Sequence, residues 1–166
     1  LTIGSGSAAI VLCHRKYSRT GHRLLGGEVL ADTSANDLCA GGSLAPGAVD
    51  RPQMSTDSEA LLHAGVNLAE RTWQRFLGNL EWTPAGVNKV FTHQVGKAHR
   101  QLLLDRLRLD AARDFPTVEF LGNTGAAALP TAAALGIQHG HVQSGDRVAL
   151  LGIGSGLSCI MLGLEW

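Results

Sequence analysis

The amino-acid sequence predicts an α/β layered fold with a mixed, mostly parallel sheet. The first observation is the order of elements after residue 56, which alternates helix, strand, helix, strand, helix, strand and strand. The second is that polar residues follow two predicted strands, with His93 after 89–92 and Asn123 after 117–121. Ligand sites of such sheets lie beyond the carboxyl ends of the strands, so both residues are candidates for one site.

Composition restricts the classes to which this chain can belong. Its 166 residues are enough for one domain with a buried core, and 14 basic residues balance 14 acidic ones. This balance argues against a nucleic-acid surface and against a polybasic membrane anchor. No stretch is long and apolar enough for a transmembrane helix. The three cysteines form neither a disulfide framework nor a zinc site, which favours reduced thiols and a cytoplasmic location.

The first third of the chain is expected to hold two strands and a long loop. Residues 1–12 are apolar and small, and their glycines indicate a strand with a tight turn or bulge. Residues 13–21 form a polar, basic connection to a second strand over 24–31, and residues 32–53 predict a long surface loop. Because the chain begins on Leu1, without Met or a signal peptide, we expect that it was cut from a longer one.

A long amphipathic helix follows this loop. Residues 56–59, Thr-Asp-Ser-Glu, have the pattern of a capping box. Apolar residues then recur at spacings of three and four, which places them on one helical face: Leu62, Val66, Ala69, Trp73 and Phe76. Gly78 and Asn79 predict the end of the helix. Thr83 and Pro84 predict the cap and first residue of a short helix ahead of the strand over 89–92.

Five further elements complete the expected order. Residues 97–107 predict a helix, and residues 117–121 a strand that ends in a Gly-Asn turn. The alanine-rich residues 126–139 predict a helix whose small side chains allow close packing and which Gly140 closes. Strands over 147–152 and 157–165 enclose a Gly-Ser-Gly turn and form a closing hairpin.

His93, Asn123 and this hairpin have the chemistry of an oxyanion-stabilising site. His93 lies just ahead of a helix N-terminus, where imidazolium is disfavoured, so a neutral imidazole is expected. Asn123 would add an amide donor, and the hairpin glycines would bring a backbone N–H close to a ligand. The alternatives stay open, because His93 is one of seven histidines and Asn123 between glycines suits a turn or a helix N-cap.

Other interpretations of these motifs are less favoured. The glycines of 152–156 match neither a dinucleotide-binding loop nor a nucleophile elbow, and nothing near Ser155 in the sequence would activate its hydroxyl. Each cysteine fits a packed or loop thiol better than a nucleophile. Two histidine pairs lack the accompanying ligands of a metal site, namely His93 with His99 and His139 with His141.

Residues 82–166 resemble the C-terminal half of thiolase-superfamily condensing enzymes of the β-ketoacyl-ACP synthase III type. The matching marks are His-Gln after a strand, Gly-Asn-Thr-Gly-Ala with a downstream Pro, Gly-Asp-Arg before a strand, and the glycine hairpin. The closer likeness is to olefin-biosynthesis thiolases, through His-Gln-Val at 93–95 with His99, Leu-Cys at 38–39 and the hairpin at 150–157. The resemblance implies a thiolase-like fold in which residues 1–23 end the N-terminal half and its connection, and residues 24–166 form the C-terminal half.

The resemblance also implies roles for three groups. His93 and Asn123 match the catalytic His and Asn that hold the carbonyl or enolate of the donor thioester, and the backbone N–H of Ser155 matches the oxyanion-hole donor. The nucleophilic cysteine and the glutamate base of such enzymes belong to the N-terminal half, to which no residue here corresponds. A companion chain that carries this half is therefore implied, in a complete unit expected to be a homodimer.

The implied activity is an acyltransferase that joins two fatty acyl-CoA molecules head to head, by Claisen condensation, into a β-keto acid. Its substrates are acyl-CoA or acyl-ACP, and it uses no cofactor and no metal. Decarboxylative condensation with malonyl-ACP, as in β-ketoacyl-ACP synthase III, is the first alternative. A non-catalytic acyl-binding or scaffolding subunit is the second.

Overall fold

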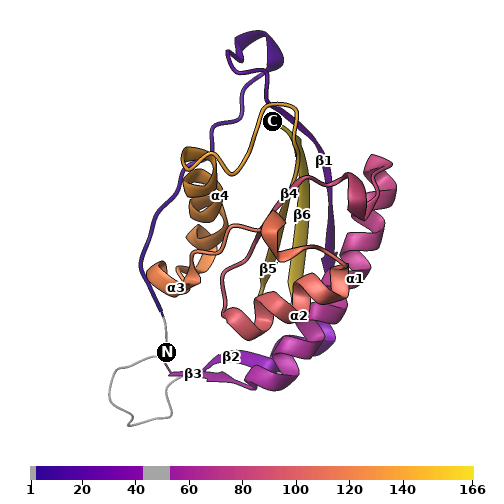
Figure 1. Ribbon diagram of the computed structural model, residues 1–166. Coiled ribbons are helices and arrows are strands. Elements are labelled where there is room, and N and C mark those ends of the chain that lie inside the picture. Colours follow the sequence, from indigo (N-terminus) through magenta and orange to yellow (C-terminus); the bar gives the residue numbers. More distant parts are fainter. Residues whose placement is uncertain (1–2, 43–52) are drawn as a thin grey trace.

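The computed structural model describes residues 3–42 and 53–166, and Figure 1 shows a sheet flanked by helices with a small hairpin at one end. The strands are β1 (Arg23–Ala31), β2 (Cys39–Gly42), β3 (Gln53–Thr56), β4 (Lys89–Thr92), β5 (Arg147–Gly154) and β6 (Ser158–Glu165). The helices are α1 (Ser58–Leu80), α2 (Lys97–Leu107), α3 (Val118–Leu121) and α4 (Ala128–Gln138), joined in part by short 3₁₀ turns.

Four strands form one sheet in the order β1-β6-β5-β4. β4 and β5 are parallel, whereas β5 with β6 and β6 with β1 are antiparallel. The expected α/β fold with a mixed sheet is confirmed, but the expectation that the sheet is mostly parallel is wrong. The reason is the closing hairpin, whose two strands pair along their whole length and whose outer edge takes up β1 in the antiparallel sense.

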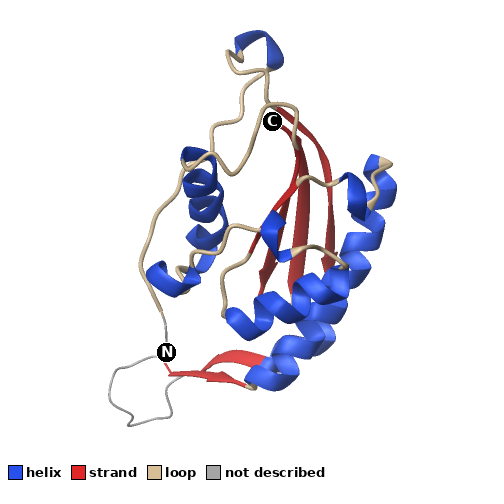
Figure 2. Cartoon of the chain, in the orientation of Figure 1, coloured by secondary structure: helices blue, strands red, loops and turns tan. Residues whose placement is uncertain are grey.

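Helices cover the two faces of this sheet (Figure 2). α1 packs on β1 and β6, and α2 packs on α1. Alternate residues of β5 point to opposite faces, so Ala149 and Leu151 join the core under α1, while Val148 joins a second core with Ala132 of α4. Within residues 3–42 and 53–166, no helix is long and apolar enough to cross a membrane.

The boundaries of α1 differ slightly from the expected ones. Asp57, and not Thr56, is the N-cap, and its side chain accepts a hydrogen bond from the Ala60 N–H at 3.0 Å. The helix continues through Gly78 and ends where Glu81 adopts a left-handed conformation with φ of 53°. The Trp82 N–H then donates back to the Leu77 carbonyl at 2.9 Å, which closes the last turn without a glycine.

Residues 118–121 form the helix α3, with Thr117 as its N-cap, so the strand expected over 117–121 is wrong. The side chain of Gln94 accepts hydrogen bonds from the Thr117 and Val118 N–H groups, at 2.8 and 3.1 Å. These bonds satisfy donors at the start of a helical turn. A tertiary contact therefore decides the local structure, and such a contact is invisible in the apolar pattern of five residues.

The expected N-terminal strand and the long loop also differ from the structure. Ile3 forms an isolated bridge with Asn123, and the segment that follows pairs with no strand in the described part of the chain. In place of one continuous loop, residues 33–38 form a 3₁₀ turn and β2 pairs with β3. Residues 43–52 of that expected loop lie outside the described residues.

The alanine-rich helix α4 packs closely on the sheet, as expected from its small side chains. Ala132 is fully buried, and Gly136 lies directly over Phe91 of β4. A Cβ atom added at Gly136 would lie 2.5 Å from Phe91 Cε1 and 3.2 Å from Phe115 Cγ. The two rings set how closely α4 can approach the strand.

We expect Gly136→Ala to lower the free energy of unfolding by about 1–3 kcal/mol, because overpacking outweighs the better helix propensity of alanine. Urea denaturation measures this change. Gly78→Ala in α1 is the matched control, since nothing lies within 4 Å of its added Cβ, and it should stabilise the chain by up to about 1 kcal/mol. A Gly136→Ala variant as stable as the parent would contradict the close packing.

Candidate functional site

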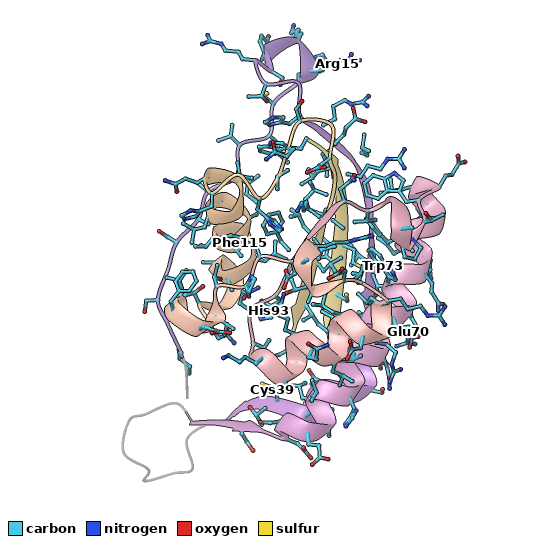
Figure 3. The ribbon with its side chains drawn as sticks, viewed as in Figure 1. Arg15, Cys39, Glu70, Trp73, His93 and Phe115 are labelled. Atoms are coloured by element: carbon cyan, nitrogen blue, oxygen red, sulfur yellow. The ribbon has the colours of Figure 1, made fainter. Side chains whose placement is uncertain are left out.

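The carboxyl ends of β4 and β5 bring two of the candidate residues to one edge of the sheet. His93 directly follows β4, and its backbone N–H donates to the Leu151 carbonyl of β5 at 3.0 Å. β5 ends at Gly154, and Ser155 begins the turn to β6. His93, labelled in Figure 3, therefore lies at the same edge as the β5–β6 turn, where the topology places ligand sites.

The His93 imidazole is half-buried ahead of α2. Burial lowers its pKa below the ordinary histidine value, because desolvation disfavours the imidazolium form. The ring is therefore neutral near pH 7, and it can donate a hydrogen bond from one nitrogen while the other accepts. The sequence predicts the same neutral state from the helix N-terminus, whereas in the structure desolvation accounts for it.

Gln94 joins the segment of His93 to the segment that leads to Asn123. Its Oε1 atom accepts from the first N–H groups of the α3 turn, and its Nε2 atom donates to the Thr92 carbonyl at 2.8 Å. The residue is 2% exposed, so these bonds form out of contact with water. Both ends of one amide are thus used to fix the end of β4 against α3.

A buried carboxylate supports the same strand end from the other side. Asp114 accepts from the Thr92 N–H at 3.2 Å and from the Thr92 hydroxyl, and it forms an ion pair with Arg100 of α2. Its side chain is fully buried, while that of Arg100 is mostly so. Charge-assisted bonds in such a place are short and geometrically specific. They hold α2, and with it the segment 93–96, in a fixed position on β4.

Asn123 lies in the turn between α3 and α4. This is the turn position that its flanking glycines suggested as an alternative to a catalytic role. Its Oδ1 atom accepts from the Gly125 N–H at 2.9 Å, and its carbonyl accepts from the Gly4 N–H at 3.0 Å. The amide oxygen is therefore occupied locally, and the Nδ2 group is the donor that the side chain offers. No hydrogen bond within the described residues joins Asn123 to His93.

Ser155 is exposed in the β5–β6 turn, and its surroundings include a cysteine from the distant β2 strand. The Ser155 hydroxyl donates to Cys39 Sγ at 3.5 Å, as does the Thr56 hydroxyl. These two bonds lower the pKa of the Cys39 thiol. The turn is also tied to the end of β1, since Asp32 and Leu157 exchange backbone hydrogen bonds at 2.9 and 3.0 Å. The position of the Ser155 backbone is therefore fixed from two sides.

His99, on the inner face of α2, is a feature of this region whose placement sequence reasoning missed. Its Nδ1 atom is sealed from solvent and has no hydrogen-bond partner among the described residues. Burial, and to a smaller extent the charge of His93, together lower the pKa of His99 to about 4. The only signal in the sequence is its place six residues after His93, which by itself does not show that the side chain points inward.

His139 and His141, the second histidine pair of the sequence, contact aromatic and backbone groups. His139 stacks on Phe115, and the His141 Nε2 atom lies 3.0 Å from the Arg113 carbonyl. No group of three or more His, Cys, Asp or Glu side chains that could hold a metal ion occurs in the described part of the chain. His93 and the β5–β6 turn thus bring a neutral imidazole and backbone N–H groups to one edge of the sheet, and donors of this kind suit a developing oxyanion.

Residues 77–166, which contain all three candidates, match the family described as 3-oxoacyl-(acyl carrier protein) synthase III C terminal. The chain belongs to this synthase III family. A Shewanella oneidensis relative named acyl-CoA:acyl-CoA alkyltransferase is 41% identical to it over 170 residues, which are 100% of this chain and 49% of that relative. The synthase III chain spans about half the length of the curated relatives that it matches.

Solved structures agree with this assignment. Xanthomonas campestris OleA with bound lauric acid and lauroyl-CoA is similar with a TM-score of 0.80 and 32% identity, over 91% of this chain and 42% of OleA. The 3-oxoacyl-(acyl carrier protein) synthase III FabH of Xanthomonas oryzae gives a TM-score of 0.77 and 33% identity, over 87% of this chain and 40% of FabH. The resemblance to the C-terminal half of a thiolase-like condensing enzyme is therefore confirmed.

The Gln94 amide is expected to be essential to the stability of this synthase III chain. Gln94→Leu leaves buried N–H groups of α3 and the Thr92 carbonyl without partners, each at a cost of about 1–3 kcal/mol. We expect the free energy of unfolding, from urea denaturation, to fall by about 3 kcal/mol or more. Gln101→Leu is the matched control, because Gln101 is exposed and, among the described residues, its side chain bonds to Asp105 on its own helix. Equal effects of the two substitutions would contradict the role of Gln94.

The buried His99 is expected to make the chain less stable in mild acid. Its pKa in the folded state, about 4, lies below the ordinary 6.5, so the unfolded state binds the proton first as the pH falls. The contribution of His99 to stability is complete above pH 6.5 and is lost towards pH 4, by about 3 kcal/mol in total.

Urea denaturation at pH 7 and pH 4.5 checks this expectation. His99→Gln should reduce the loss of stability between the two pH values, whereas replacing the exposed His63 in the same way should leave it unchanged. A loss of stability that is the same in all three proteins would show that His99 does not titrate as described.

Proposed function

We propose that this chain is the electrophilic half of a thiolase-type acyltransferase that condenses two fatty acyl thioesters head to head. The observation that carries the proposal is the neutral, half-buried His93 at the edge of the sheet, with the β5–β6 turn beside it and Gln94 linking it to the segment of Asn123. The name of the Shewanella oneidensis relative, an acyl-CoA:acyl-CoA alkyltransferase, supports CoA thioesters as the substrates.

In the first half-reaction, a cysteine thiolate of a companion half attacks the thioester carbonyl of one acyl-CoA. The carbonyl oxygen becomes an oxyanion, which accepts a hydrogen bond from the Ser155 backbone N–H, and the intermediate expels CoA thiolate to leave an acylated cysteine. The site needs no charged donor here, because a backbone N–H held in a rigid turn requires little reorganisation.

In the second half-reaction, a carboxylate of the companion half removes a proton from the α-carbon of the second acyl-CoA. The enolate oxygen accepts hydrogen bonds from the neutral His93 ring and from the Asn123 Nδ2 group. The α-carbon then attacks the acyl-cysteine carbonyl, a carbon–carbon bond forms, and the cysteine thiolate leaves. Hydrolysis of the remaining thioester releases CoA and a β-keto acid.

Exposed apolar surface supports the companion half as a partner. Val29 of β1 and Ile160 of β6 are cross-strand neighbours that are 62% and 44% exposed, and Val11 is 88% exposed. Apolar area of this kind favours association, because its burial removes it from water. In this proposal residues 1–23 pack with the companion half, residues 24–166 form the C-terminal half, and the complete unit forms a homodimer in the cytoplasm.

Substitution of the two proposed donors in the complete assembly tests this function. We expect His93→Ala and Asn123→Ala each to lower the kcat of acyl-CoA condensation about 100-fold or more, since each removes a donor to the enolate oxygen. Exposed residues of the same types provide matched controls, namely His63→Ala and Asn36→Ala, which should retain full activity.

Two outcomes would favour other functions. Full activity of the His93→Ala and Asn123→Ala double variant would indicate a non-catalytic acyl-binding or scaffolding subunit. Release of carbon dioxide with malonyl-ACP, and no product from two acyl-CoA molecules, would indicate the decarboxylative reaction of β-ketoacyl-ACP synthase III. The family match to residues 77–166 keeps this second reaction in consideration.

A further inference from the structure

We propose that His99 is a positioning residue for His93, a second neutral imidazole that supports the polarised ring of His93 during condensation. The inference rests on the proposed function of His93. It starts from the placement of His99 near the start of α2, where its side chain points toward the sheet and borders a cavity of about 10 Å³. The other walls come from α1, α2, β5 and β6, with Ala69, Leu103, Gly152 and Met161 among them.

The unpaired Nδ1 atom of His99, which borders this cavity, lowers the stability of the fold. Nδ1 of His99 is sealed from solvent and finds no partner among the described residues, whereas the other side chains around the cavity are aliphatic or sulfur-containing. A buried polar atom without a hydrogen bond disfavours the folded state by about 1–3 kcal/mol. Leucine would fill similar space without that cost. No contact among the described residues compensates for burying the polar imidazole. We therefore infer a role for it in the adjacent site.

Leu151 connects this cavity to the site. Its carbonyl accepts the His93 N–H at 3.0 Å, and Leu151 itself borders the cavity beside His99. The charge of His93 is the second cause, after burial, that lowers the pKa of His99, and the two residues lie six positions apart around the start of α2. The titratable groups that face His99 are His93 and, from β6, Cys159, whose thiol pKa is raised by burial. From α1 and β5 only uncharged residues border the cavity.

A neutral polar ring in this place can act on His93 without taking part in proton transfer. When His93 donates to the enolate oxygen, positive charge builds up on its ring, and an apolar wall would disfavour that charge. The dipole of the neutral His99 imidazole offsets part of this penalty. The His99 dipole therefore lowers the free energy of the transition state and has little effect on substrate binding.

The test compares His99→Leu with His99→Gln in the complete assembly, using condensation kinetics with acyl-CoA. We expect His99→Leu to lower kcat about 10-fold with KM within about twofold, while thermal stability rises. His99→Gln keeps a neutral polar group in the cavity and should recover most of the kcat. Titration of the His93 ring by NMR should show a further lowering of its pKa in His99→Leu, which simple space filling would not cause.

The outcomes separate this inference from the function on which it rests. Unchanged kcat and unchanged His93 pKa in His99→Leu, with His93→Ala inactive, would overturn the role of His99 and leave the proposed function intact. Equal loss of kcat in both His99 variants, without a change in the His93 pKa, would also overturn it, because packing alone would explain the loss. An active His93→Ala assembly would instead overturn the proposed function.

Discussion

The buried amide of Gln94 is the interaction on which the candidate site depends. Residues 93 and 123 lie thirty positions apart on segments that share no strand pairing among the described residues, and this buried amide binds both segments. Its oxygen starts α3, which leads into the Asn123 turn, and its nitrogen fixes the end of β4 next to His93. Because the amide is shut off from water, loosening either end would leave unpaired polar groups in the interior. The geometry of the donors is therefore set by the core.

Charge is distributed around the site so that the imidazoles stay neutral. The carboxylate of Asp114 is fully buried, but Arg100 compensates it, and its remaining acceptor capacity is used by Thr92. His93 and His99 stand in an environment that disfavours their charged forms. Neutral donors of this kind stabilise an oxyanion through hydrogen bonds that are already oriented before the reaction.

The sequence predicted much of the fold, and it failed where a tertiary contact overrides local pattern. The strand at 89–92 and the helix at 97–107 are correct to the residue, since apolar spacing and buried faces determine them. The strand at 117–121 was wrong because Gln94, far away in sequence, starts a helix there. His93 and Ser155 could be selected as candidates from their places after a strand and in a turn, whereas Asn123 was selected from its place after an expected strand that is the helix α3. The inward orientation of His99 could not be foreseen, because no periodic pattern specifies which polar residue of a short helix faces the core.

In the proposed reaction, this chain supplies oxyanion donors and takes its nucleophile from a companion half. Intact-mass measurement of the complete assembly after brief exposure to a fatty acyl-CoA tests it most directly. We expect the mass of one acyl group to be added to the companion half, while the mass of this 17.4 kDa chain stays unchanged. An acyl group on one of its own cysteines, Cys39 above all because its thiol contacts Ser155, would contradict the account. Condensation by the isolated chain would contradict it equally.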